Sequence, residues 1–435
     1  MAEVVGITLL GHGTVGRGVV RLLREQGELL FRRTGLRFEL RHIVVRDRSR
    51  HPEELPCTTD AEAAIDDPQV RVVIELIGGI EAADRLIRRA LSAGKPVVTA
   101  NKSLLAARGP TLMQLARRHH TCIGFEASCG GGIPIIGALQ RGLLANRIDA
   151  LVGIVNGTCN LILTRMTGQG WTYARALAEA QQLGFAEADP TLDVSGADAA
   201  QKLAILAGLA FDSTIDPSSI YREGIDHLEP IDLRFAAELG YVVKLLAIAE
   251  RTVEDRISLR VHPTLIHRQD VLADVNGSFN AISVYGHALG HALFYGRGAG
   301  AMPTASAVVS DLLAVTTGVL PAAFARLRFW SDEQDAARLQ PIGDLRSRYY
   351  LRLLARDVPG TIAQITEVLG RHGISISAIM QREDNGGKFV PVVITTHIAL
   401  EANVSAALRE IDRLACILPT TVRLRILDPP TEASE

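Results

Sequence analysis

Lys202 is one of only five lysines in a chain of 435 residues that carries 46 basic side chains. Unlike arginine, lysine can release a proton near neutral pH, and its compact ammonium group can protonate an oxygen that develops negative charge. Asp198 precedes Lys202 by four residues, so on a helix the two side chains share one face. The pair therefore predicts a lysine acid/base with an aspartate partner. An ordinary helical ion pair is the alternative.

An acidic loop lies just upstream of this pair. It contains Glu187, Asp189 and Asp193, and the following helix is expected to begin near Ser195 as its N-cap. Apolar residues on most faces of that helix predict that it is buried. The loop brings more negative charge than one salt bridge needs, which suits a pocket for a substrate with an ammonium group. Some of the acids could instead cap the helix or hold the loop.

A strand, a glycine turn and a helix follow one another at the start of the chain. The apolar run Val4 to Leu10 predicts the strand, and the spacing of apolar residues from Val15 to Leu30 predicts the helix. Glycines in such a turn let a pyrophosphate approach the N-terminus of the helix. The sequence therefore predicts a dinucleotide site that includes Gly11, Gly13, Thr14, Val15 and Gly16.

The second strand, Phe38 to Val45, is followed by basic residues where NAD-binding folds usually place an acid against the ribose. Arg46, with Arg50, could hold the 2′-phosphate of NADP. Asp47 keeps NAD open as the cofactor, and a solvated turn without ligand contacts is the alternative.

The βαβ alternation continues through strands Val72 to Leu76 and Val97 to Thr99, which the helix Ala82 to Ala93 separates. The carboxyl ends of such strands face the ligand crevice. Gly78, Thr99 and Lys102 are therefore expected near the cofactor, and Lys102 is a second lysine placed for chemistry unless it is an ordinary surface residue.

Charge and composition exclude several classes of partner. The net charge is −2 and the arginines are spread along the chain, which gives no basis for binding nucleic acid or an anionic membrane. No apolar run approaches the roughly 18 residues that span a bilayer. The five cysteines are odd in number and scattered, so neither disulfides nor a zinc site is indicated. A cytoplasmic enzyme with reduced thiols is expected.

Motifs spread over nearly the whole chain resemble those of homoserine dehydrogenases. They are GHGTVGRG from Gly11, TANK from Thr99, EASCGGGIPII from Glu126, NGTCN from Asn156, GFAEADPTLDVSGADAAQK from Gly184 and YGRGAGAMPTASAVVSD from Tyr295. The resemblance implies reversible, NAD(P)H-dependent reduction of L-aspartate 4-semialdehyde to L-homoserine in threonine, methionine and isoleucine biosynthesis. Because no aspartate kinase segment precedes Met1, a monofunctional enzyme is expected.

The resemblance also implies roles for single residues. Lys202 matches the lysine that transfers a proton to the substrate oxygen, Asp198 its partner, and Glu187 the residue that holds the substrate amine. Further substrate contacts are implied for Asp193, Thr158 and Lys102, with Lys102 also near the nicotinamide. Cofactor contacts are implied for Gly298 and Thr304.

A structural sodium ion is implied at the segment that begins with Glu126. Its ligands would be backbone carbonyls of Cys129, Gly131 and Ile133, since a hard cation prefers oxygen. The family often has valine at the position of Cys129 and tyrosine at that of Phe185. The first difference leaves a backbone ligand intact, and the second removes a possible hydroxyl contact.

The fold class expected is α/β with three domains. They are a Rossmann-type NAD(P)-binding domain over 1–132, to which a helix at 306–320 returns, an α+β catalytic domain over 133–320, and a ferredoxin-like domain over 349–428. DVPGTIAQITEVLGRHGISI in the last of these resembles an ACT domain. An amino-acid effector such as L-threonine is implied there, with a domain that serves only oligomerisation as the alternative. A homodimer or homotetramer is expected.

Two rival functions start from the same residues. Cys129 in a glycine-rich turn could be the nucleophile of a phosphorylating aldehyde dehydrogenase, although no paired histidine is evident. An amino-acid and nucleotide sensor would bind cofactor without turnover. The preference between NAD and NADP, the effector and its sign, the oligomeric state and the occupancy of the cation site are left open.

Overall fold

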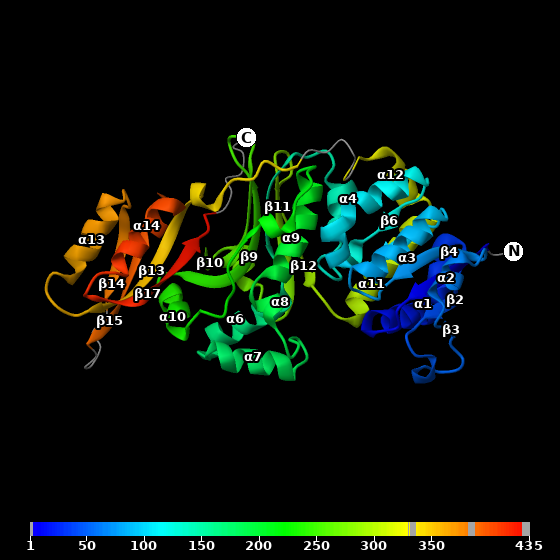
Figure 1. Cartoon of the computed structure of the whole chain (residues 1–435), viewed down its shortest axis with the longest axis horizontal. Helices are drawn as coiled ribbons and strands as arrows, with labels where there is room; N and C mark the ends of the chain where they lie inside the picture. The colour runs from blue at the N-terminus through cyan, green and yellow to red at the C-terminus, as the bar shows by residue number, and fades with distance from the viewer. Residues whose placement is uncertain (1–2, 329, 331–335, 382–387, 429–435) are drawn as a thin grey trace. The chain divides into compact units, whose positions relative to one another are not determined.

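The computed structural model describes residues 3–328, 330, 336–381 and 388–428 (Figure 1). The hairpin turn expected at Asp384 to Gly387 and the tail from Pro429, expected to be disordered, lie outside these residues. The chain forms two compact units. The first contains Met1–Ile148, Ala200–Ile220 and Phe279–Ala337, and the second contains Asp149–Ala199, Tyr221–Ser278 and Arg338–Glu435.

The first unit is built on a parallel sheet of six strands in the order β3-β2-β1-β4-β5-β6. The strands are β1 (Glu3–Leu10), β2 (Leu36–Val44), β3 (Cys57–Thr58), β4 (Val70–Glu75), β5 (Val97–Thr99) and β6 (Ile123–Gly124). Their Val, Ile and Leu side chains are mostly buried, as in parallel sheets covered on both faces. The predicted Rossmann-type fold class is confirmed.

Helices connect these strands: α1 (Thr14–Thr34), α2 (Ala61–Asp66), α3 (Glu81–Ser92) and α4 (Lys102–Arg118). Two later helices, α11 (Ala301–Thr316) and α12 (Val319–Arg326), belong to the same unit. α11 packs closely against α1, because a Cβ on Gly18 would lie 2.8 Å from the carbonyl oxygen of Ala301. None of the described helices could cross a lipid bilayer alone, and only α11 with α12, bent by 75°, passes as a pair on length and composition.

The helix that carries Lys202 is α9 (Ala197–Ala210). The expectation that Ser195 is its N-cap is wrong, because Ser195 ends the short helix α8 (Thr191–Val194) and donates its N–H to the carbonyl of Thr191. Gly196, with a φ of +79°, turns the chain between the two helices.

The second unit contains a mixed sheet with the strand order β7-β9-β10-β17-β13-β15-β14. These strands are β7 (Ile148–Ile154), β9 (Tyr241–Arg251), β10 (Ile257–His267), β17 (Ile417–Ile426), β13 (Arg346–Arg356), β15 (Phe389–Thr396) and β14 (Ile376–Gln381). Two short strands, β8 (Tyr221–Arg222) and β16 (Ala399–Leu400), pair with β10 and β13. The helices of this unit before residue 278 are α6 (Gly157–Gln169), α7 (Tyr173–Gln182), α8 and α10 (Pro230–Glu238).

The ferredoxin-like domain completes this unit. Its order is β13, α13 (Thr361–Arg371), β14, β15, α14 (Glu401–Ile411) and β17, which is the predicted βαββαβ pattern. Figure 1 shows β17 and β13 beside each other, with the helices α13 and α14 of this domain drawn in shades of orange. β17 also pairs in parallel with β10 at Thr264 and Leu265. The sheet of this domain therefore continues into the sheet formed by β7, β9 and β10.

Candidate active site

The glycine turn after β1 has the geometry of a ligand-binding turn. Gly11 has a φ of +102°, and a Cβ there would lie 2.7 Å from the carbonyl oxygen of Leu76. A Cβ on Gly16 would lie 2.3 Å from the carbonyl of Gly11, so the turn closes tightly. Gly13, the N-cap of α1, faces open space. The N–H groups of the first turn of α1, which begins with Thr14 and Val15, are thus accessible to an anion.

The loop after β2 places Arg46 on the surface. Asp47 is occupied by other partners: its carboxylate accepts from the Ser49 N–H at 3.0 Å and pairs with Arg50 at 3.1 Å. The hydrogen bonds from Ser49 lower the pKa of Asp47. Because Arg50 is paired with Asp47, Arg46 is the better placed of the two arginines for a phosphate.

Two histidines that the sequence reasoning did not single out bring this loop to the glycine turn. His12 lies inside the turn, and its Nδ1 is 3.1 Å from Nδ1 of His51. Burial, followed by the charges of His51 and nearby arginines, lowers the pKa of His12. Nothing in the local pattern of either histidine indicates a contact between residues so far apart in the chain.

The carboxyl ends of β4 and β5 are joined by a buried carboxylate. Glu75 accepts from the Thr99 hydroxyl at 2.6 Å and from the Gly78 N–H at 3.1 Å. Asn101 donates to the carbonyl of Gly79 at 2.6 Å and caps α4, whose first residue is Lys102. Glu75 and Asn101 were missed from the sequence, although an acid that ends an apolar strand and an Asn that precedes a helix are recognisable signals.

The two helices that carry Lys102 and Lys202 meet in the first unit. The Ser103 hydroxyl donates to the side-chain oxygen of Gln201 at 3.1 Å, and each of these residues is next to one of the lysines. Most side chains of α9 after Lys202 are buried, as predicted from its composition. Lys102 and Lys202 therefore lie on two helices, α4 and α9, that contact each other.

In the second unit one amide joins two of the predicted carboxylates. Asn156 donates through Nδ2 to Asp193 at 2.7 Å and to Asp198 at 2.8 Å. Its Oδ1 accepts from the Cys159 N–H at 2.8 Å and so caps α6. Asp198 is buried and lies four residues before Lys202 on α9. Asn156 was missed as a site residue, although its position before a helix marks it as a cap.

Asp193, which was expected in the acidic loop, lies in α8, whereas the two other acids remain in the loop. Glu187 and Asp189 are exposed. Asp189 accepts from the Thr191 N–H at 3.0 Å, and hydrogen bonds from Thr191 lower its pKa, so this acid holds the loop. Thr158 donates from its hydroxyl to the Phe185 carbonyl at 2.8 Å, which ties the start of α6 to the loop.

The segment predicted to hold a cation is closely packed in the first unit. The Glu126 carboxylate accepts from the N–H groups of Ile136 and Gly137 at 2.8 and 2.7 Å. The Glu126 N–H donates to Asp311 at 2.7 Å. Burial raises the pKa of Glu126 and raises that of Asp311 to about 7. Glu126 therefore anchors the residues that follow the glycine segment.

Two glycine segments meet at this place. A Cβ on Gly131 would lie 2.5 Å from the carbonyl carbon of Gly298, and the Gly132 N–H donates to the Arg297 carbonyl at 3.1 Å. Thr304 is buried in the first turn of α11. Gly298 and Thr304 thus lie beside the Gly131 segment.

Cys129 has the surroundings of a structural thiol. It is 1% exposed, and its Sγ lies 3.9 Å from the backbone oxygen of Lys202. A reactive thiol needs an accessible, electropositive environment that stabilises the thiolate. This burial counts against a nucleophilic role.

Comparisons with known proteins found matches over most of the sequence. The family profile described as "Homoserine dehydrogenase, NAD binding domain" matches residues 11–126, "Homoserine dehydrogenase" matches 134–313, and "ACT domain" matches 349–416. A homoserine dehydrogenase of Pseudomonas aeruginosa is 42% identical over 428 residues, with 97% of this chain and 98% of that protein covered. A Bacillus subtilis homoserine dehydrogenase is 40% identical over 424 residues, with 95% and 96% covered.

Solved structures agree with these matches. The crystal structure of a homoserine dehydrogenase from Thiobacillus denitrificans superposes with a TM-score of 0.91 at 43% identity, over 98% of this chain and 99% of that one. A hyperthermophilic archaeal homoserine dehydrogenase in complex with NADPH superposes with a TM-score of 0.62 at 26% identity. It covers 72% of this chain, and 98% of the archaeal chain is matched.

Proposed function

The chain belongs to the homoserine dehydrogenase family. From this premise we propose which residues take part in the reduction of L-aspartate 4-semialdehyde to L-homoserine. The protein is an NAD(P)-dependent oxidoreductase of amino-acid biosynthesis with a C-terminal ACT domain. The observation that carries the assignment of residues is the Asn156 amide, which holds Asp193 and Asp198 together one helical turn before Lys202.

Lys202 is the proton donor in this proposal. When bound, the nicotinamide cofactor supplies the hydride. Negative charge then develops on the aldehyde oxygen, where the Lys202 ammonium stabilises it and transfers a proton. Asp198, one turn earlier on α9, favours the charged form of the lysine. Microscopic reversal makes the neutral lysine the base that accepts the hydroxyl proton of homoserine.

The remaining residues orient the substrate. Glu187 and Asp193 carry the negative charge that the substrate ammonium group requires, and Thr158 fixes the loop that presents Glu187. Lys102, at the start of α4, is assigned to the substrate and nicotinamide side of the site. The support is the match of each residue to its family motif together with the bonds described above.

The direct test is consumption of NADPH by the purified protein with L-aspartate 4-semialdehyde, followed by the reverse reaction with L-homoserine and NADP. We expect turnover in both directions. Binding of NADPH without turnover of either substrate would favour the sensor function instead.

The glycine turn fits a dinucleotide, because open space at Gly13 leaves room for a pyrophosphate at the start of α1. We propose that Arg46 binds the 2′-phosphate and that NADPH is the preferred cofactor. In support, Asp47 already bonds to Ser49 and Arg50 and is poorly available to a ribose hydroxyl.

Replacing Arg46 with alanine is expected to lower kcat/KM for NADPH by roughly 10- to 100-fold, as one lost hydrogen bond to a charged group implies. The value for NADH should change less than about twofold, since NADH has no 2′-phosphate. Steady-state kinetics with both cofactors measure this. Arg50→Ala is the matched control, because Arg50 is paired with Asp47. Equal losses with both cofactors would contradict the assignment.

Replacing Asn156 with alanine is expected to lower kcat by about 10- to 100-fold, since two charged hydrogen bonds are lost. Asn156 is a positioning residue that acts through Asp193 and Asp198. The N–H groups of the Asn156 amide favour the ionised forms of Asp193 and Asp198. Loss of the amide is therefore expected to raise the pKa of each of these two carboxyl groups. The acid limb of the pH–rate profile should therefore move to higher pH.

Asn160→Ala is the matched control on the same helix. Asn160 is buried and donates to the Val275 carbonyl at 3.0 Å, so its loss should lower the melting temperature and leave the acid limb in place. An unchanged pH profile in Asn156→Ala would show that the amide only caps α6.

We further propose a structural sodium ion at the backbone carbonyls of Cys129, Gly131 and Ile133. The Ile133 carbonyl accepts one bond, from the Ile135 N–H at 2.8 Å, and keeps a second lone pair. The Glu126 carboxylate already accepts hydrogen bonds from two N–H groups. It would therefore contribute negative charge near the ion without coordinating it directly. The donor set fits a hard cation.

Regulation, assembly and location complete the proposal. An amino-acid effector such as L-threonine is proposed for the ACT domain. A homo-oligomer is proposed because the strand β12 (Gly290–Arg297) exposes Leu293 and Tyr295, the latter by 55%. A cytoplasmic location is proposed because the five cysteines are all free thiols.

A further inference from the structure

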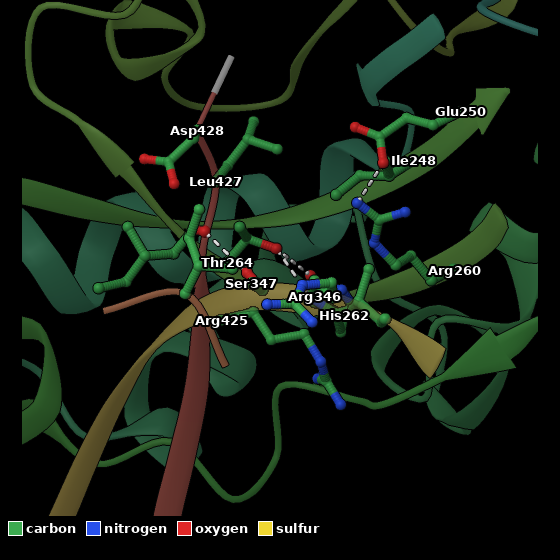
Figure 2. A pocket seen from close by; sticks show the side chains of 13 residues that line it. Ile248, Glu250, Arg260, His262, Thr264, Arg346, Ser347, Arg425, Leu427 and Asp428 are labelled. Atoms are coloured by element: carbon green, nitrogen blue, oxygen red, sulfur yellow. Dashed lines mark hydrogen bonds and ion pairs between the residues drawn. The ribbon is translucent and has the colours of Figure 1, made fainter. Parts of the chain in front are cut away.

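A cavity of about 170 Å³ lies in the second unit beside β10 (Figure 2). At this place the ACT strands join the part of the sheet formed by β7, β9 and β10. β8 pairs with β10 at Arg260 and Val261, and β17 pairs with it at Thr264 and Leu265. His262 and Pro263 lie between these two ladders. In liquid water each molecule occupies about 30 Å³, so the volume of this cavity is several times that of one water molecule. The cavity therefore has room for a small metabolite.

The wall of this cavity is unusually polar for a buried strand. Arg260, His262 and Thr264 alternate along β10 and so share one face of the sheet. Each is less than 10% exposed, and each lines the cavity. Figure 2 shows Glu250 of β9 and Ser347 of β13 on the same cavity. Such a face would normally carry apolar side chains, so the polar residues point to a specific role.

His262 presents a buried acceptor. Its Nδ1 is 3.1 Å from the Pro263 carbonyl, which can only accept a hydrogen bond, so the proton is assigned to Nδ1. The Thr264 hydroxyl donates to the His262 carbonyl at 3.0 Å and can accept from the same ring nitrogen at 2.9 Å. Nε2 then carries a lone pair, and it has no hydrogen-bond partner within the described parts of the chain.

Charges of both signs complete the wall. Arg260 donates to Ser258 at 2.9 Å and to Glu250 at 2.6 Å, which uses two of its five N–H donors. Burial and the charges of Arg425 and Arg260 hold the pKa of His262 well below its usual value, so the ring is neutral. The cavity thus offers a guanidinium for a carboxylate, and a carboxylate with a neutral imidazole for an ammonium group.

We propose that this cavity binds a free amino acid with a short side chain. The ammonium group donates to Nε2 of His262 and to Glu250, and the carboxylate accepts from Arg260. The ligand would touch β10 and the ACT strand β13 at once, so it would couple the ACT domain to the substrate-domain sheet. The site deepens the proposed regulation and rests on it only for the choice of amino acids to test.

Isothermal titration of the full-length protein with L-threonine, L-homoserine, L-methionine and L-isoleucine tests the site. We expect at least one to bind, and its Kd to rise at least tenfold in His262→Phe, which removes the acceptor, and in Ser347→Met, which fills the cavity. Circular dichroism and melting curves establish that each variant is folded. The two changes are on different strands, so either folded variant decides the outcome.

Ile379→Arg is the matched control. It places a charge on the exposed face of β14, where Ile379 is 43% exposed, and should leave the Kd unchanged. Absence of binding by all four amino acids, or an unchanged Kd in the folded cavity variants, would overturn the site. Loss of binding in Ile379→Arg alone would place the effector on β14 and overturn it too. Turnover assayed in parallel separates these outcomes from failure of the proposed reaction.

Discussion

Replacing Lys202 with alanine lowers kcat for reduction of L-aspartate 4-semialdehyde by about 10²- to 10⁴-fold, the usual contribution of a positioned general acid. The Kd of NADPH, measured by fluorescence titration, should stay within about twofold. Lys202→Arg is expected to be nearly as inactive, because a guanidinium keeps the charge but does not release a proton. Stopped-flow measurement of NADPH oxidation under single-turnover conditions isolates the chemical step.

Lys95→Ala is the matched control for this result. Lys95 belongs to the first unit, as Lys202 does, and donates to the carbonyls of Ile65 and Asp67 at 2.5 and 2.7 Å. Its loss should reduce stability and leave kcat within about twofold. A Lys202→Ala enzyme with more than a tenth of the normal kcat would assign proton transfer to another group, with Lys102→Ala as the next variant to measure.

Replacing Arg425 with methionine lowers the free energy of unfolding by roughly 3–5 kcal/mol, the usual effect of removing one partner of a buried ion pair. Arg425 is 1% exposed and donates to Glu401 at 2.9 and 2.8 Å and to Glu223 at 3.0 Å. Arg423 also pairs with Glu223, at 2.8 Å, which favours the lower end of the range. Urea denaturation followed by circular dichroism measures the loss.

The surface pair of Arg371 and Glu410 gives the matched control. These side chains are 56% and 38% exposed, so Arg371→Met should cost less than about 1 kcal/mol. A similar loss from both variants would mean that the buried network contributes no more than a surface pair.

The same network gives stability a defined pH dependence. Burial alone would raise the pKa of Glu223, but the charge of Arg425 and the hydrogen bonds from Arg425 and Tyr221, with a further contribution from Arg423, together outweigh burial and hold the pKa at about 2, below the usual 4.5. The ionised carboxylate therefore stabilises the fold above pH 4.5, and this stability is lost as pH falls from 4.5 toward 2. In Arg425→Met this part of the acid dependence should be weaker.

Much of the nucleotide domain could be predicted from local pattern. The strand at Val97 to Thr99 was predicted with its observed bounds, because β-branched residues between turn signals mark a buried parallel strand. β10 shows where such reasoning stops. The sequence pattern predicts a strand only from Ile257 to Val261, whereas β10 continues to His267, because the polar residues from Arg260 to Thr264 are buried in the folded protein. Local sequence does not reveal that cover.

Some residues of the candidate site could likewise be predicted from local sequence, whereas others could not. Lys202 and its acidic neighbours were found from residue type and spacing alone. Asn156 was not, because an Asn before a helix predicts a cap, and its two carboxylate partners come from the distant helices α8 and α9. The contact between His12 and His51 likewise depends on the tertiary fold. Residues that act through distant partners are thus those that pattern reasoning misses.

The parallel pairing of β17 with β10 has a consequence for synthesis of the protein. β10 is translated long before β17, so part of its edge stays uncovered while the ACT domain is being made. An uncovered strand edge is a template for pairing with other chains. Pro263 lacks an N–H group and lies in this stretch, which blunts the edge during that interval. Pro263 therefore makes pairing of this edge with another chain less favourable until β17 is made.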